Sequence, residues 1–345
     1  MRQPLQGAQP PCHAAAMTRR RFGLSAGAGL LAPAAMAAAP DGPDGPSRYP
    51  RRPITLVVPS VAGNVNDAVA RLLGQGLTER WGQPVVIDNR PGAGSTTGTK
   101  LVARAPADGH TALLTFTAHV QNPALYAQVG YDPIADFEAV SLVAKSSVIL
   151  AVSADFPHRS LAPLVQAVAA EPDRYAYGSY GVGTTGHILG ELLKRQARLK
   201  MAHTPYKGGV PLGNDLAAGH IPIGLIAVGT AMPLLQAGRI VPVAITGARR
   251  STLLPQVPTF LELGYQGFEP DAWMGLLFPA GTPQAITAQL SREVSRLVQQ
   301  PAIVQRLHGL NLEPVGSTPQ AFAATLRADQ AKWAQLVREL DIRLE

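Results

Sequence analysis

Cysteine is almost absent from this chain of 345 residues, since Cys12 is the only one. A single thiol excludes an intramolecular disulfide and any metal site made of several cysteines. Long hydrophobic runs are also absent, because no segment reaches the roughly 18 uninterrupted apolar residues typical of a membrane-spanning helix. Charged residues make up 15% of the chain and apolar residues 46%, a composition that indicates a globular protein and excludes a disordered one.

The positive net charge of the chain is concentrated at its N-terminus. The first 39 residues contain no Asp or Glu but include Arg2, Arg19, Arg20 and Arg21, and subtracting these four charges from the net charge of +7 leaves +3. The rest of the chain therefore produces a weak electrostatic field, and no basic block in it is longer than a pair. We expect no nucleic acid or other polyanion as a partner.

The N-terminal segment has the features of an export signal. Consecutive arginines at 19–21 precede an apolar run at 24–31, and the small residues at 33–39 include an A-x-A pattern. The arginines match a signal of the twin-arginine type, and the apolar run is too short for a permanent membrane anchor. We therefore expect residues 1–39 to be a cleaved export signal and the residues 40–52, rich in Pro and Gly, to be a flexible leader.

From residue 53 onwards, β-rich runs alternate with segments of helical periodicity. This alternation predicts an α/β fold in which helices cover parallel or mixed sheets. The predicted strands cover 54–59, 84–88, 111–117 and 175–179, and the predicted helices cover 67–79, 97–105, 187–196, 283–299, 301–307 and 319–340.

The length of the chain exceeds the about 100–200 residues of an ordinary domain and predicts two lobes. Two apolar runs, 147–153 and 273–278, have the composition of buried strands and are candidates for crossings between the lobes. If both cross, lobe 1 comprises 53–150 plus 271–345, and lobe 2 comprises 151–270. One large sheet is the alternative.

Three loops that lead from a predicted strand into a predicted helix share a chemistry. They are PSVAGNVND at 59–67, RPGAGSTTG at 90–98 and GSYGVGTTG at 178–186. Each would present unpaired backbone N–H groups and the positive end of a helix dipole, and glycine allows an anion to approach the main chain. Ordinary helix capping is the alternative for any one loop. The similarity of GAGSTTG to GVGTTG favours a shared anionic ligand.

Enzyme motifs are few. Gly181, Gly183 and Gly186 fit the G-x-G-x-x-G pattern of dinucleotide-binding enzymes, so an exported oxidoreductase with a nucleotide cofactor is the alternative function. However, residues 192–214 contain no Asp or Glu, although an acidic residue that binds the ribose is expected there. Zinc-protease and nucleophile-elbow motifs do not occur, so we expect no catalytic residues and no metal.

Ten short segments, in this order, resemble the Bordetella-type uptake receptors, which are periplasmic solute-binding proteins of tripartite tricarboxylate transporters. The resemblance covers nearly the whole chain after residue 48. The segments are VP at 58–59, DAVAR at 67–71, NRPGAG at 89–94, APADG at 105–109, NPALY at 122–126, GVGTTGH at 181–187, PYKGG at 205–209, QAGR at 236–239, PQVPT at 255–259 and PAGTP at 279–283.

The resemblance implies a two-lobed periplasmic-binding-protein architecture, similar to type II, with a cleft between the lobes. It implies a monomeric periplasmic receptor without catalytic activity or cofactor that captures a small organic acid or amino-acid-like carboxylate for integral membrane transporter subunits. Together with the three loops, it indicates a set of ligand-binding residues. They are Ala62, Gly63, Asn64, Asp67, Gly94, Ser95, Thr117, His119, Gly183, Thr184, Thr185, His187, Tyr206 and Lys207.

Two positions depart from the pattern of this family. Asn64 occupies the place of the second glycine in A-G-G-x-x-D, and Ile226 stands where relatives often have Asp. An amide side chain at the first position changes the loop that faces the ligand. A hydrophobic residue at the second position predicts a less polar wall and a less polar ligand.

Overall fold

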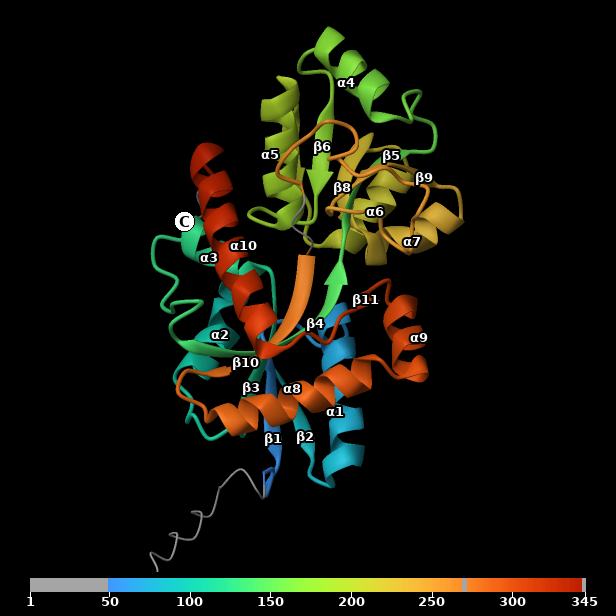
Figure 1. Cartoon of the computed structure of the whole chain (residues 1–345). Coiled ribbons are helices and arrows are strands. Elements are labelled where there is room, and N and C mark those ends of the chain that lie inside the picture. The colour runs from blue at the N-terminus through green and yellow to red at the C-terminus, as the bar shows by residue number, and fades with distance from the viewer. Residues whose placement is uncertain (1–48, 269–271, 343–345) are drawn as a thin grey trace, which may run out of the picture. The chain divides into compact units, whose positions relative to one another are not determined.

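The computed structural model describes residues 49–268 and 272–342 (Figure 1). The predicted export signal at 1–39 and residues 40–48 of the predicted leader lie outside the described residues. Within the described ranges, no helix combines the length and the hydropathy needed to cross a membrane.

The first sheet contains six strands: β1 (Ile54–Val58), β2 (Val85–Asn89), β3 (Thr111–Phe116), β4 (Phe137–Ser146), β10 (Ala272–Pro279) and β11 (Glu313–Pro314). Their order in the sheet is β11-β4-β10-β3-β1-β2. Strand β1 is parallel to β2 and β3, whereas β10 is antiparallel to β3 and β4. The central strands are almost entirely buried, which explains their continuous runs of Val, Leu and Ile.

The second sheet contains five strands: β5 (Val148–Ser153), β6 (Ala176–Ser179), β7 (Ala202–Pro205), β8 (Ile223–Ala227) and β9 (Ile240–Ile245). Their order is β7-β6-β8-β5-β9. Strand β6 is parallel to β7 and β8, and β5 is antiparallel to β8 and β9. In both sheets, therefore, the parallel strands bring several strand-to-helix loops to one edge.

Helices cover both sheets (Figure 1). Those on the first sheet include α1 (Val65–Trp81), α2 (Thr96–Ala103), α3 (Ala118–Leu125), α8 (Gln284–Val298), α9 (Pro301–Gly309) and α10 (Pro319–Glu339). Those on the second are α4 (Leu161–Ala170), α5 (Thr185–Ala197), α6 (Gly209–Ala217) and α7 (Val228–Gln236). A single turn of 3-10 helix, η2 (Ala93–Ser95), precedes α2.

Polar caps fix where the helices begin. Asn64, Thr184 and Thr318 each have extended backbone, and their side-chain oxygens accept a hydrogen bond from the N–H group three residues later. Such a cap contributes about 1 kcal/mol and leaves the other N–H groups of the first turn unpaired.

The predicted α/β fold with two lobes is confirmed, and the alternative of one large sheet is wrong. Each predicted strand and helix is present, and its ends differ from the prediction by a few residues at most. Strands β4 and β5 are consecutive in the chain, yet they belong to different sheets. The change of sheet occurs at Ser147, close to the predicted crossing at 147–153. The exact lobe boundaries stay a prediction.

Truncation of Phe322 should destabilise the fold strongly. This α10 side chain is fully buried, and its ring meets the Trp273 ring edge to face at 5.2 Å. Phe322→Ala should therefore lower the free energy of unfolding by about 3–5 kcal/mol in denaturant titrations. The control is Leu101→Ala on α2, where the side chain is 40% exposed and the loss should stay within about 0.5 kcal/mol. Equal losses for the two variants would contradict the placement of α10.

Candidate functional site

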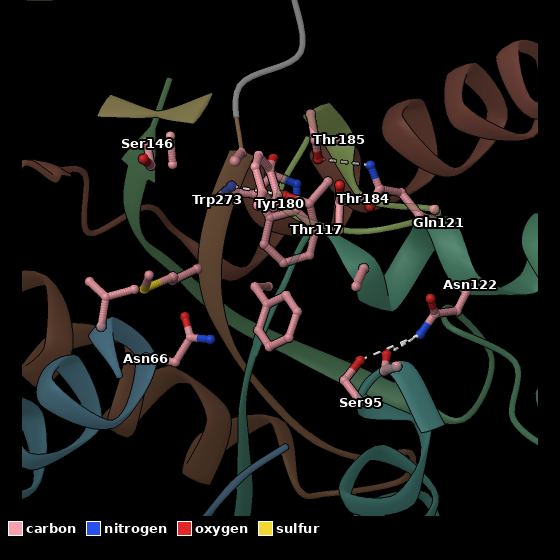
Figure 2. A pocket seen from close by; sticks show the side chains of 18 of the residues that line it. Asn66, Ser95, Thr117, Gln121, Asn122, Ser146, Tyr180, Thr184, Thr185 and Trp273 are labelled. Atoms are coloured by element: carbon pink, nitrogen blue, oxygen red, sulfur yellow. Dashed lines mark hydrogen bonds between the residues drawn. The ribbon is translucent and has the colours of Figure 1, made fainter. Parts of the chain in front are cut away.

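A cavity of about 420 Å³ lies where elements of the two sheets meet (Figure 2). Its walls come from the carboxyl ends of β3, β4 and β8, the loop after β6, the first turns of α1, α3 and α5, and the beginning of β10. Parallel α/β sheets commonly bind ligands at this position, because the carboxyl ends of their strands leave a crevice between adjacent loops.

The beginning of α1 contributes Val65 and Asn66 to the cavity wall. Asn64 caps this helix by accepting a hydrogen bond from the Asp67 N–H at 3.0 Å. The N–H groups of Val65 and Asn66 lie in the first turn, have no intrahelical acceptor, and donate to no other group within the described chain. They remain available to a ligand that can accept hydrogen bonds.

The beginning of α5 is arranged in the same way. Thr184 caps the helix, and the hydroxyl of Tyr180 accepts a hydrogen bond from the Gly186 N–H at 3.1 Å. Gly183, with φ of 72°, makes the turn that places Thr184 and Thr185 on the wall. Among the described residues, the Thr185 N–H has no acceptor.

A third loop reaches the cavity through Gly94 and Ser95, whose φ angles of 61° and 82° lie in the left-handed region. The Asn122 side chain on α3 holds this turn, since its Nδ2 donates to the Gly94 carbonyl at 2.8 Å and to the Ser95 hydroxyl at 3.4 Å. The ring of Tyr126 packs directly against Gly94, where a Cβ atom would meet its hydroxyl at 2.6 Å. This turn therefore requires glycine.

Two hydrogen bonds fix the side chains of the cavity. Gln121 on α3 donates from Nε2 to the Thr185 hydroxyl on α5 at 3.0 Å, which joins elements of the two sheets (Figure 2). The Thr117 hydroxyl accepts the Trp273 backbone N–H at 2.9 Å and thereby ties the end of β3 to the beginning of β10. Gln121 and Thr117 are almost completely buried, so they hold fixed positions.

No Lys, Arg, Asp, Glu or His is among the residues that line the cavity within the described chain. Burial raises the pKa of Tyr180 to about 12, so its hydroxyl stays protonated. The electrostatic potential is therefore set by the N-terminal ends of the helices, each equivalent to about half a positive charge. Such a cavity suits an anion that accepts hydrogen bonds.

Six of the fourteen predicted ligand-binding residues line the cavity: Gly94, Ser95, Thr117, Gly183, Thr184 and Thr185. Ala62, Gly63, Asn64 and Asp67 lie in or near the first loop but are not part of the wall. The buried Asp67 carboxylate accepts hydrogen bonds from the Gly63 N–H and from Arg71, both at 2.9 Å. The Arg71 guanidinium, followed by the Gly63 N–H, lowers the pKa of Asp67, which stays ionised and braces this loop.

The two predicted histidines have internal partners. His119 is fully buried, donates from Nε2 to the Pro133 carbonyl at 2.9 Å and stacks on Tyr131. His187 accepts the Gly183 N–H at Nδ1 at 3.0 Å and stacks on His203 at 4.0 Å, so it supports the turn from behind. Burial lowers the pKa values of both, that of His119 to about 4.

Tyr206 and Lys207 lie on the loop after β7, away from the cavity wall. The Tyr206 hydroxyl donates to the Asp215 carboxylate at 2.9 Å, and Lys207 is exposed. Ile226, which differs from the family pattern, lies inside β8 and is completely buried, so it is not part of the wall. The next residue, Ala227, does reach the wall.

Sequence reasoning missed more than half of the wall. Six of the missed residues lay in segments with a usable signal: Asn122 and Tyr126 in a segment that carried the family resemblance, and Val65, Asn66, Tyr180 and Val182 in two of the three loops. The other eight had no such signal, because β3, α3, β4, β8 and β10 reach the cavity only through tertiary structure. These residues are Phe116, Ala118, Gln121, Ser146, Ala227, Ala272, Trp273 and Met274.

The family model described as "Tripartite tricarboxylate transporter family receptor" matches residues 69–342 of this chain. A UPF0065 protein from the tcbD-tcbE intergenic region of a Pseudomonas species is 35% identical over 292 residues, covering 84% of this chain and 87% of that protein. Protein BugT of Bordetella pertussis is 31% identical over 299 residues, covering 86% and 92%.

Three solved protein structures are also similar to this chain. Periplasmic binding protein BugD is 31% identical with a TM-score of 0.74, covering 86% of this chain and 100% of that one. A Rhodopseudomonas palustris protein solved with adipate is 34% identical with a TM-score of 0.76, at the same coverage. MatC from Rhodopseudomonas palustris, solved with malate, is 31% identical with a TM-score of 0.72, covering 84% and 100%.

The burial of His119 should make stability depend on pH. The unfolded chain binds a proton near pH 6.5, whereas the folded chain keeps His119 neutral down to about pH 4, so stability is lost as pH falls through this window. His119→Gln should flatten the dependence of the unfolding free energy on pH between 6.5 and 4, measured by denaturant titration.

The control for this measurement is Tyr131→Phe, which removes the hydrogen bond from the Tyr131 hydroxyl to the His119 carbonyl at 3.1 Å. It should cost about 1 kcal/mol at each pH and leave the slope unchanged. An unchanged slope in His119→Gln would show that His119 does not contribute to the pH dependence.

Proposed function

Because the chain belongs to the tripartite tricarboxylate transporter receptor family, confirming the resemblance seen in its sequence, we propose that it captures a small carboxylate in the periplasm. We further propose that it presents this ligand to the integral membrane subunits of a tripartite transporter. The observation that carries the proposal is a cavity at which the first turns of α1 and α5 and the turn before α2 converge and whose described wall contains no charged side chain. The adipate and malate in related structures support a carboxylate as the ligand.

The physical basis is hydrogen bonding to the main chain. A carboxylate would accept the N–H groups of Val65 and Asn66 at one end of the cavity or that of Thr185 at the other, with the hydroxyl of Ser95 as a further donor. The Thr184 hydroxyl already donates to the Gly181 carbonyl at 2.7 Å, so it holds the turn. Charge-assisted hydrogen bonds of this kind are stronger than neutral ones, and the helix dipoles add to them. A micromolar dissociation constant corresponds to about −8 kcal/mol and requires no buried Lys or Arg.

We assign the six residues of the wall named above to ligand contact, and Asn64, Asp67 and His187 to support of the loops. Asn64 and Asp67 shape the first loop, and His187 holds the Gly183 turn. Protein–ligand contacts of this kind favour binding without chemistry, since no residue of the wall, as far as the structure describes it, is a general base or a nucleophile activated by one.

The same cavity argues against a nucleotide-cofactor oxidoreductase. No acidic side chain within the described wall is available to a ribose. Gly183 forms the turn that leads into α5. A nucleotide-binding loop also leads from a strand into a helix through glycines, which explains why the two glycine patterns are alike.

We propose that lobe 1 comprises 53–150 plus 271–345 and that lobe 2 comprises 151–270. Ligand binding should stabilise a closed arrangement of these two lobes. A ligand that contacts both lobes favours the closed state by its difference in affinity for the two states. The membrane subunits would recognise that state. We propose that the protein is a monomer and that an N-terminal signal, which is then cleaved, directs its export.

Substitution of Gly183 should abolish ligand binding. Its φ of 72° is unfavourable for a β-branched residue, so Gly183→Val should displace the turn before α5. A thermal-shift panel of mono-, di- and tricarboxylates should raise the Tm of the wild-type protein with at least one acid, and the variant should lose this shift.

Gly238→Val is the matched control, since Gly238 has a similar φ of 65° in the loop after α7 and lies outside the cavity wall. It should lose comparable stability and keep the ligand-induced shift. A wild-type protein stabilised by nucleotides and by no carboxylate would refute the proposed function.

A further inference from the structure

The cavity is rich in aromatic side chains. Phe116, Tyr126, Tyr180 and Trp273 are four of its twenty wall residues, whereas aromatic residues make up 6% of the whole chain. Met274, whose thioether also packs favourably on rings, lies beside Trp273 in β10. Hydrogen bonding to a carboxylate does not by itself require so many aromatic side chains in the wall.

Two of these rings are held in place by contacts behind the wall. The Trp273 indole donates from Nε1 to the Asp329 carboxylate at 2.7 Å, and its ring meets Phe322 at an interplanar angle of 84°. The Tyr180 hydroxyl is fixed by the Gly186 N–H. Because these two rings are anchored, this part of the wall is preformed, and a rigid ligand would lose little entropy on packing against it.

Polar side chains are spread over several parts of the wall. Figure 2 shows Ser95 with Asn122 on one side, Gln121 with Thr184 and Thr185 on a second side, and Asn66 on a third. Thr117 and Ser146 also line the cavity. A matching ligand therefore has an apolar body that packs against the rings and carries polar groups that reach these side chains.

Charge in the cavity restricts the ligand further. Within the described wall an ammonium group would find no carboxylate, because no acidic side chain belongs to it. Amino acids thus fit this wall poorly, although they satisfy the general description of a small carboxylate.

We propose that the ligand is an aromatic carboxylate, a six-membered ring with one or two carboxylates at its edge. The inference rests on the proposed function and specifies its substrate class. The ring would pack against the aromatic wall while the carboxylates accept hydrogen bonds at the helix starts. Each aromatic pair strengthens binding by about 2- to 10-fold relative to a contact of equal area.

Isothermal titration calorimetry of matched acids tests this class. The pairs are benzoate against cyclohexanecarboxylate, and terephthalate against trans-cyclohexane-1,4-dicarboxylate, with adipate, citrate and glutamate as further probes. At least one aromatic acid should bind about tenfold more tightly than its saturated partner and than adipate. Equal or tighter binding of the saturated acids, or of adipate, would overturn the inference and leave the proposed function intact. If no carboxylate binds, the proposed function itself fails.

Phe116→Leu tests whether the ring wall causes the preference. Phe116 is partly exposed at the end of β3, and leucine preserves most of its volume. The variant should reduce the ratio of the two dissociation constants several-fold and change the affinity for the saturated acid little. Phe156→Leu, a buried position outside the cavity wall, is the control and should keep the wild-type ratio. A wild-type ratio in Phe116→Leu would contradict the role of this ring.

Discussion

The N–H groups in the first turns of α1 and α5 are the constraint on which the site depends. The helix starts cannot satisfy all of these donors internally, and the caps formed by Asn64 and Thr184 use only part of them. The remaining donors face a cavity without a cationic side chain in its described wall. In the proposed function a helix start therefore serves as the anion-binding group, and its position is fixed by the sheet behind it.

In this arrangement, some residues supply the N–H donors and neighbouring residues hold the loops that carry them. The ionised Asp67, the neutral His187 and the amide of Asn122 make hydrogen bonds to the loops themselves, so they determine where the donors point. The Gln121–Thr185 hydrogen bond then connects an element of each sheet across the cavity. Polar side chains that a sequence motif identifies as functional can thus act by positioning the main chain.

Much of the fold was predictable because its signals are local. The apolar run of β1, the cap at Asn64 and the glycine that ends α1 each have a physical meaning within a few residues. The site was less predictable, since six of the twenty wall residues were predicted. Gly94 and Gly183 were visible because their turns require glycine, whereas Phe116 and Trp273 reach the cavity from strands more than 150 residues apart. No pattern along the chain records that the two strands are neighbours.

Amide NMR during a carboxylate titration tests the central claim most directly. With ¹⁵N-labelled protein and the tightest-binding acid, the amide protons of Val65, Asn66 and Thr185 should move downfield more than those of the rest of the chain, because each gains a charged acceptor. If these three signals stay in place while the acid binds, the carboxylate is held by other groups, and the account of an uncharged, main-chain anion site is incorrect.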